Sequence, residues 1–520
     1  MKLRIGILDN LTGWQVILSQ IGLPYSLVES TMSSDDFSII VGSEIPEQSK
    51  LDQIIQYLNQ GGALLCSTNL LSKIKPAIKF KSSFIDYLVP EKHPILESIG
   101  IIDVYTKCKI PENANLLKSS KGIYTAFIAE NNERIIALPF CPDRMIQDNR
   151  TAVKLFYSPS GKAPFEEVSK VSKGEIRKLV AQCIEYLHHS RGLPYVQLWH
   201  LPDDYPAIFC FRIDTDSSTK KNVEKLYYLI HKNKIKASWF VDVKNNESFI
   251  TTYRKFRLQE IGTHCFEHVT YDKYEPNLEN IRKANQILRK SGIRAKGFVA
   301  PYGVWNIQLG KAIKDAGFSY SSEFAYDYDN LPGTPQLDQA SGVLQIPIHP
   351  ICIGNLKQQG YNIKQMIHYF EYVISKKLAQ REPIILYHHP NDNYLIALNW
   401  LFKKIKKLRI PVMTLLEFAK WWNRRINLQL EIEYSGNILQ VLTKPSSKSL
   451  CLRITNSDRT ESFIKVSKQV TKIEINKISR KPITSSPITE NHLKVKKFDF
   501  KTLILVLRTK TIKLMNFLRK

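Results

Sequence analysis

The sequence lacks any long apolar run. Among its 520 residues, no stretch approaches the roughly 20 consecutive apolar side chains that a membrane-spanning helix needs. The first apolar run, residues 3–8, ends at Asp9 and is too short for the core of a signal peptide. These two absences predict a cytoplasmic protein with no transmembrane segment.

Cysteine is scarce and dispersed. There are eight cysteines, and no two of them have Cys-x-x-Cys spacing. This pattern favours buried, reduced thiols over a disulfide framework or a structural zinc cluster.

Acidic residues are too few to balance the basic ones. The sequence has 48 Asp and Glu against 74 Lys and Arg, which gives a formal net charge of +26. Residues 431–520 hold 19 Lys and Arg and only 7 Asp and Glu. This segment is predicted either to contact an anionic surface or to form a solvated basic face. Interleaved aromatic stacking motifs are missing, so no specific nucleic-acid partner is predicted.

The chain is too long for one hydrophobic core, since domains usually have about 100–200 residues. Changes in composition, a Pro-rich stretch and the alternating pattern of the C-terminal residues predict four parts. They are an α/β domain (1–190), a linker (191–206), a second α/β domain (207–425) and a small, basic, β-sandwich-like domain (426–520).

In the first domain, short buried strands alternate with helical segments, which predicts a mostly parallel, flavodoxin-like sheet. A helix near residues 173–188 is expected to complete it. The segment Tyr-Leu-Asn-Gln-Gly-Gly-Ala-Leu-Leu-Cys (57–66) resembles glutamine-amidotransferase-like folds. Cys66 lacks the flanking glycines of the amidotransferase nucleophile turn, so we expect this domain to be non-catalytic.

The second domain begins with an apolar strand that ends in carboxylates, Ala-Ile-Phe-Cys-Phe-Arg-Ile-Asp-Thr-Asp (207–216). Alternate residues of a strand share a face, so Arg212, Asp214 and Asp216 are predicted to project together. Carboxylates at such a strand end lie where α/β barrels form their active sites. The alternative is structural, because Asp216 and the residues after it could cap the next helix.

Two histidines follow in Gly-Thr-His-Cys-Phe-Glu-His (262–268). At positions i and i+4, His264 and His268 can reach one cation, and imidazole nitrogen suits zinc and related metals. A hydrogen-bonded histidine pair without a metal is the alternative.

Two further segments place polar groups directly after strands. Pro301 and Gly303 bracket Tyr302 in a predicted turn, which could present a backbone N–H to a ligand, or could be an ordinary loop. His389 follows the buried segment 383–388, where it could act as a general acid or simply pack on Pro390.

In this order and spacing, the four segments resemble the polysaccharide deacetylase family, the NodB-homology carbohydrate esterases. The flanking segments 236–241, 317–322, 346–347 and 414–418 also resemble family segments. The resemblance implies a distorted (β/α) barrel of NodB type for residues 207–425.

The resemblance also implies roles for single residues and one divalent metal ion, which would be zinc, with cobalt or nickel as alternatives. Asp214 would be the general base, His389 the general acid, the N–H of Tyr302 an oxyanion donor, and Asp216, His264 and His268 the metal ligands.

Three positions depart from the family pattern. Thr215 separates two aspartates that are usually adjacent, so the roles of Asp214 and Asp216 could be exchanged. Val299 stands where the Arg-x-Pro-Tyr turn has its arginine, and we hypothesise that Arg212 takes over its ionic role. The carboxylate that tunes His389 is left open between three candidates, Glu323, Asp327 and Asp329.

The predicted function is metal-dependent deacetylation of N-acetyl sugars in a polysaccharide or glycan precursor. Hydrolysis of another small C–N amide bond is the second enzymatic hypothesis. A catalytically inactive glycan-binding module is the third, prompted by Val299. Adhesion to a membrane or nucleic acid through charge alone is the fourth.

Overall fold

The computed structural model forms two compact units that interleave along the chain. The first unit comprises the described parts of 1–148, 171–204 and 422–488, and the second those of 149–170 and 205–421. The described residues are 1–9, 12–29, 32–44, 47–129, 133–338, 340–444, 450–466, 469–483, 504 and 507.

A nine-stranded sheet forms the centre of the first unit, in the order β2-β1-β3-β4-β9-β8-β7-β5-β6. Its first five strands are parallel, as the alternation of strands and helices predicts. They are β2 (Tyr25–Leu27), β1 (Ile5–Ile7), β3 (Ile39–Gly42), β4 (Leu64–Ser67) and β9 (Ile135–Leu138). Four antiparallel strands extend the sheet: β8 (Tyr124–Ile128), β7 (Leu116–Ser119), β5 (Phe80–Val89) and β6 (Ile102–Pro111).

The helices of the first unit pack apolar side chains on this sheet. They are α1 (Thr12–Ile21), α2 (Gln48–Asn59), α3 (Thr68–Ile74), α4 (Pro142–Ile146) and α5 (Lys173–Ser190). Trp14 and Ile17 of α1 are fully buried in the same core as Leu179 and Ile184 of α5. Cys66 is also buried, and burial raises the pKa of its thiol, so it is not an activated nucleophile.

Two antiparallel sheets complete the first unit. One has the order β12-β25-β26-β28 and the other β23-β24-β27. Their strands are β12 (Tyr195–Leu198), β25 (Cys451–Thr455), β26 (Thr460–Lys465), β28 (Lys481–Pro482), β23 (Gln429–Ser435), β24 (Ile438–Lys444) and β27 (Val470–Glu474). The segment expected to be a linker thus contains β12, and Leu3 donates its N–H to the carbonyl of Ile432 in β23. The C-terminal strands therefore share a compact unit with the first residues of the chain.

The second unit is built on a curved, all-parallel sheet in the order β20-β17-β16-β15-β14-β13-β21, with β22 also paired to β13. This arrangement confirms the α/β class and fits a NodB-type barrel. The strands are β13 (Phe209–Asp214), β14 (Ser238–Val241), β15 (Glu260–Thr263), β16 (Gly297–Phe298), β17 (Tyr320–Ser321), β20 (Leu344–Gln345), β21 (Ile384–His388) and β22 (Val412–Met413).

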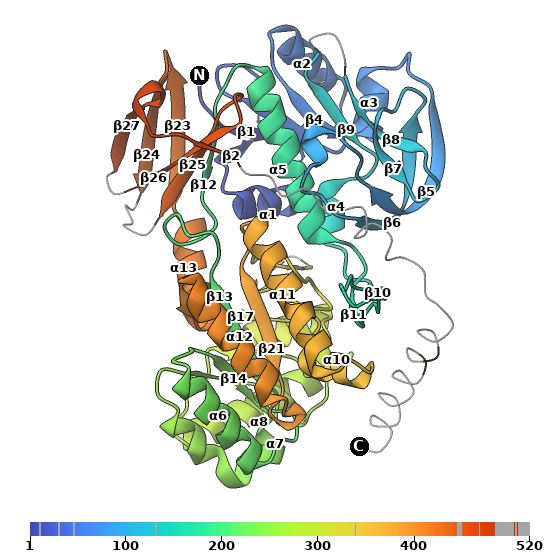
Figure 1. Ribbon diagram of the computed structural model, residues 1–520. Coiled ribbons are helices and arrows are strands. Elements are labelled where there is room, and N and C mark those ends of the chain that lie inside the picture. Colours follow the sequence, from blue (N-terminus) through green and yellow to red (C-terminus); the bar gives the residue numbers. More distant parts are fainter. Residues whose placement is uncertain are drawn as a thin grey trace. The chain divides into compact units, whose positions relative to one another are not determined.

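Helices lie around this sheet (Figure 1). They are α6 (Lys220–Lys232), α7 (Val243–Asn246), α8 (Tyr274–Lys290), α9 (Ile307–Asp315), α10 (Ile353–Gln358), α11 (Ile363–Ala379), α12 (Leu395–Leu408) and α13 (Leu415–Ile426). Because helices cover it, strand β13 is buried along its whole length. The ring of Phe211 in β13 packs edge-on against Phe402 of α12, with 5.1 Å between centroids.

Two short hairpins also belong to the second unit, β10 (Thr151–Leu155) with β11 (Phe165–Ser169), and β18 (Gln336–Leu337) with β19 (Ala340–Ser341).

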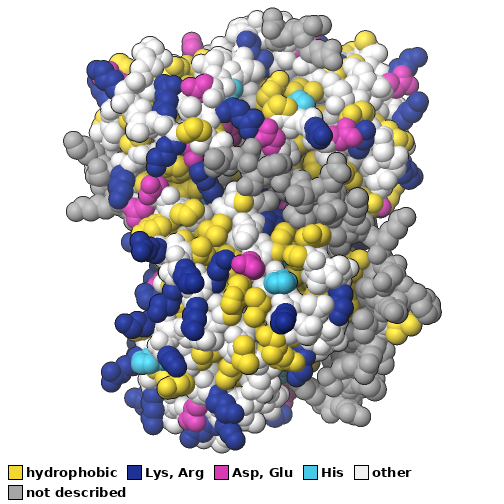
Figure 2. All heavy atoms as spheres, in the orientation of Figure 1, with side chains coloured by type: hydrophobic (Ala, Val, Ile, Leu, Met, Phe, Trp, Pro, Cys, Tyr) yellow, Lys and Arg dark blue, Asp and Glu magenta, His cyan; other side chains and the backbone are white. Residues whose placement is uncertain are grey.

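Among the described residues, no helix has both the length and the apolar character needed to cross a membrane. On the face shown in Figure 2, Lys and Arg side chains are spread over both units. Of the basic segment 431–520, residues 445–449, 467–468 and 484–520 except 504 and 507 lie outside the described residues.

Candidate active site

The candidate site lies at the carboxyl end of the parallel sheet in the second unit. Asp214 is the last residue of β13, Asp242 directly follows β14, and His264 directly follows β15. These three strands are adjacent and parallel, so their carboxyl ends meet at one edge. The topology therefore brings together side chains that are up to 50 residues apart in the sequence.

The three predicted metal ligands converge. His264 Nε2 lies 2.9 Å from Asp216 Oδ1, and His268 Nε2 lies 3.3 Å from Asp216 Oδ2. The two Nε2 atoms are 3.1 Å apart. Ligands at zinc distances of about 2.0–2.2 Å in a tetrahedral arrangement lie about 3.4 Å from one another. The three ligand atoms are thus close to the spacing that one small cation requires.

The hydrogen bonding of His264 turns its free nitrogen toward this point. Its Nδ1 lies 2.7 Å from the carbonyl oxygen of Val299, so Nδ1 carries the proton and donates it there. In the neutral imidazole, Nε2 is then unprotonated, and it faces the buried Asp216 Oδ1 at 2.9 Å. A cation between these atoms would satisfy both, and the donor set of one carboxylate and two imidazoles fits zinc.

The charges of this cluster are strongly coupled. Burial alone would raise the pKa of Asp216, but His268, His389 and His264 together hold it well below its usual value. Burial would lower the pKa of His264, but Asp216 and, to a smaller extent, Asp214 and Asp242 raise it. Asp214 and Asp242 therefore lie close enough to the cluster to act on it electrostatically.

Asp214 is held by Arg212 from the same strand. The guanidinium donates from Nε to Oδ1 at 2.8 Å and to Oδ2 at 3.1 Å, and from Nη2 to Oδ2. Both side chains are almost fully buried, and a third nitrogen of Arg212 donates to the carbonyl of Ser322. Such a bidentate pair fixes the orientation of the carboxylate. This geometry fits the hypothesis that Arg212 takes over the ionic role of the arginine that Val299 replaces.

Residues 207–321 match the family model for polysaccharide deacetylase. The predicted family resemblance is thereby confirmed for this region. No curated protein matches the chain.

Solved structures also match the chain, with low identity. A protein of Mycobacterium smegmatis assigned as a polysaccharide deacetylase is 14% identical, with a TM-score of 0.38, over 44% of this chain and 94% of its own. One from Pseudomonas aeruginosa PAO1 is 16% identical, with a TM-score of 0.37, over 42% and 92%. An allantoinase is 17% identical, with a TM-score of 0.37, over 43% and 93%.

The extra residue of the polysaccharide deacetylase-like region, Thr215, has a structural partner that the sequence reasoning missed. Its hydroxyl accepts the N–H of Asp242 at 3.0 Å, and Asp242 Oδ2 accepts the N–H of Ser217 at 3.0 Å. Asp242 thus holds the residues on both sides of Asp216. The signal for Asp242 was present in the sequence, because it ends a buried strand in the same way as Asp214.

The carboxylate that pairs with His389 is Asp392, which was not among the three candidates. Asp392 Oδ2 lies 3.2 Å from His389 Nδ1, while His389 Nε2 lies 3.6 Å from Asp216 Oδ2. The three candidates have other partners: Glu323 accepts the N–H of Ala300, Asp327 accepts the amide of Asn330, and Asp329 pairs with His349 and Lys377. The i,i+3 spacing in His-Pro-Asn-Asp (389–392) was the available signal.

Tyr302 lies beside the cluster in a turn of unusual backbone conformation. Its φ of 58° and ψ of 13° are left-handed, and its side chain is 41% exposed. The ring packs edge-on against His268, with 4.9 Å between centroids. A strained, non-Gly conformation next to candidate ligands is typical of functional turns. The proposed oxyanion role of its N–H remains a prediction.

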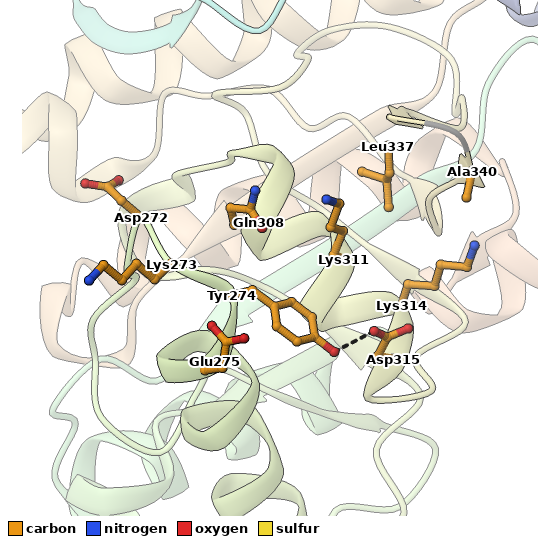
Figure 3. A pocket seen from close by; sticks show the side chains of 10 residues that line it. All are labelled: Asp272, Lys273, Tyr274, Glu275, Gln308, Lys311, Lys314, Asp315, Leu337 and Ala340. Atoms are coloured by element: carbon orange, nitrogen blue, oxygen red, sulfur yellow. Dashed lines mark hydrogen bonds between the residues drawn. The ribbon is translucent and has the colours of Figure 1, made fainter.

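A separate hollow of about 620 Å³ lies between α8, α9 and the β18–β19 hairpin. Figure 3 shows Tyr274 pointing across it to Asp315, and the hydroxyl donates to Oδ2 at 2.6 Å. None of the predicted site residues lines this hollow, and its lysines and carboxylates are mixed.

Proposed function

We propose that residues 207–425 are a metal-dependent hydrolase that removes acetyl groups from N-acetyl sugars of a polysaccharide or glycan precursor. The observation that carries the proposal is the convergence of Asp216, His264 and His268 on one point, beside an Asp214 carboxylate fixed by Arg212. A divalent ion held by these three ligands would polarise the acetyl carbonyl and lower the pKa of a water molecule.

The residues around the ligands supply the proton transfers. Asp214 takes a proton from the attacking water, whose oxygen forms a bond to the acetyl carbon. Arg212 holds this carboxylate in a fixed orientation. The N–H of Tyr302 stabilises the negative charge that develops on the acetyl oxygen.

His389 completes the reaction as the general acid. The C–N bond breaks while His389 Nε2 gives its proton to the departing amine, so the products are acetate and the free amino sugar. Asp392 orients the imidazole from the other nitrogen, and its carboxylate raises the pKa of His389 against the effect of burial. A raised pKa keeps the acid protonated until the amine departs.

Acetate release tests the proposal. The full chain, loaded with zinc, cobalt or nickel, should release acetate from N-acetylglucosamine oligomers, and chelation of the metal should stop the release. Hydrolysis of small amides without acetate release from the oligomers would instead support the second enzymatic hypothesis. Glycan binding without hydrolysis or bound metal would favour the inactive module.

A further inference from the structure

A second group of metal-ligating side chains lies on the other side of His389. Cys352 precedes α10, His389 follows β21, and Asp392 ends the short helix η4 (Pro390–Asp392). Cys352 Sγ lies 3.9 Å from His389 Nδ1, which lies 3.2 Å from Asp392 Oδ2. All three ligand atoms lie within 4.8 Å of one another.

The chemistry and spacing of this group suit a zinc-like cation. Thiolate, imidazole and carboxylate are the three side-chain types that bind zinc, and a thiolate favours softer ions over magnesium or calcium. In a tetrahedral site with ligand distances of about 2.0–2.3 Å, neighbouring ligand atoms lie about 3.4–3.6 Å apart. The two measured separations fall on either side of this value, so small side-chain rotations would close the site.

The backbone leaves room for the carboxylate. A Cβ at residue 354 would lie 2.2 Å from Asp392 Oδ2, so Gly354 is the residue that lets Asp392 approach. The thiol can also lose its proton without leaving its neighbours unsatisfied. Its present acceptor, Asn355 Oδ1, would still receive the N–H of Cys352 at 3.1 Å, and Sγ would still accept the N–H of Asn355 at 3.5 Å.

We propose that Cys352, His389 Nδ1 and Asp392 form a second, inhibitory site for a zinc-like cation. Binding releases the proton of the Cys352 thiol and the proton on His389 Nδ1. The cation then lies between His389 Nδ1 and Asp392, where the Nδ1 proton was. His389 presents its two nitrogens to opposite sides, Nε2 toward Asp216 and Nδ1 toward Cys352. An occupied second site therefore withdraws the imidazole from general acid catalysis. Only this inhibition rests on the proposed function.

Cobalt titration of the full chain, followed by absorption spectroscopy, tests the site directly. In the wild type, cobalt beyond the first equivalent should produce a thiolate-to-cobalt charge-transfer band in the near ultraviolet. Cys352→Ser should lose this band, and Asp392→Asn should require at least about 10-fold more cobalt to produce it. Cys108→Ser, which changes a buried thiol of the first unit, should keep the band.

Two outcomes would overturn the proposal: no band in the wild type at saturating cobalt, or a band that persists unchanged in Cys352→Ser. Excess zinc should also inhibit acetate release at a concentration at least about 10-fold lower in the wild type than in Cys352→Ser. A wild type that never releases acetate would defeat the proposed deacetylation, while the cobalt spectra would still decide the second site.

Discussion

Each of the two units has acidic residues near the carboxyl ends of its parallel strands. The carboxylates have different roles in the two units. In the first unit, Asp9 follows β1 and accepts the N–H groups of Ser43 at 2.7 Å and Glu44 at 3.2 Å. Asp143, a buried residue of α4, accepts the hydroxyl of Ser43. These carboxylates hold the ends of neighbouring strands together, and their own hydrogen-bonding needs are met by the protein.

The edge in the second unit leaves its polar atoms facing one another. Asp216 Oδ1 and Asp242 Oδ1 are buried, and the described residues supply no donor to either oxygen. The imidazoles of His264 and His268 turn toward the same point. A carboxylate at a strand end is therefore a weak sign of function, whereas a converging set with unmet hydrogen-bonding needs is a strong one.

The largest effect is expected at Asp214. Asp214→Asn keeps the shape of the side chain but removes the general base, so acetate release should fall by about 10²–10⁴-fold. Zinc content should not change, because Asp214 is not among the ligands. Loss of zinc together with activity would mean that the roles of Asp214 and Asp216 are exchanged.

Replacement of Arg212 should have the next largest effect on acetate release. Arg212→Lys keeps a positive charge but cannot bind both oxygens of Asp214, so kcat should fall by about 10-fold or more with little change in zinc affinity. Arg212→Met leaves a buried, unpaired carboxylate and should also lower the free energy of unfolding by about 3–5 kcal/mol. Unchanged hydrolysis by Arg212→Met would contradict the assigned ionic role.

Matched substitutions in the two edges sharpen the comparison. Asp242→Ala removes the carboxylate that holds Ser217 beside Asp216 and should weaken zinc binding by about 10–100-fold. Asp143→Ala should leave zinc affinity unchanged, although each substitution should lower the free energy of unfolding by about 1–3 kcal/mol. Zinc titration monitored by calorimetry measures the difference, and equal affinities in the two variants would refute the positioning role of Asp242.

The last expected effect concerns the stability of the first unit alone. His188 is buried between the carbonyl of Ile184 and the hydroxyl of Ser38, and burial lowers its pKa to about 3. The unfolded state, with an ordinary pKa of about 6.5, binds more protons than the folded state between these values. The contribution of neutral His188 to the free energy of unfolding is therefore fully present above about pH 6.5 and decreases as the pH falls toward 3.

Chemical denaturation at several pH values measures this contribution. Between pH 6 and pH 4, the wild type should lose up to about 1.4 kcal/mol more stability per pH unit than His188→Gln. Parallel pH dependences of the two proteins would show that His188 titrates normally in the folded state.

Local sequence patterns predicted much of both units. The alternation of buried strands and helical segments predicted the parallel part of the first sheet, and the helix expected near residues 173–188 is α5, Lys173–Ser190. The strand-end positions of Asp214 and His389 followed from the apolar runs before them. These features depend on neighbouring residues, so a single sequence contains the information for them.

Several features that depend on distant contacts or loop geometry were not predicted. Strand β12 was not predicted in the expected linker, because its partner strand β25 lies some 250 residues further along the chain. The partner of His389 was sought among three carboxylates 60 or more residues away, but the turn after His389 brings Asp392 back to its ring. Asp242 was missed because its hydrogen bonds to Thr215 and Ser217 exist only once β13 and β14 are paired.

Zinc anomalous scattering from crystals of the full chain, grown with one equivalent of zinc, would show whether Asp216, His264 and His268 hold one metal ion. We expect one strong peak within about 2.0–2.2 Å of Asp216 Oδ, His264 Nε2 and His268 Nε2. A zinc ion bound elsewhere, with these three side chains making no contact to it, would refute this assignment.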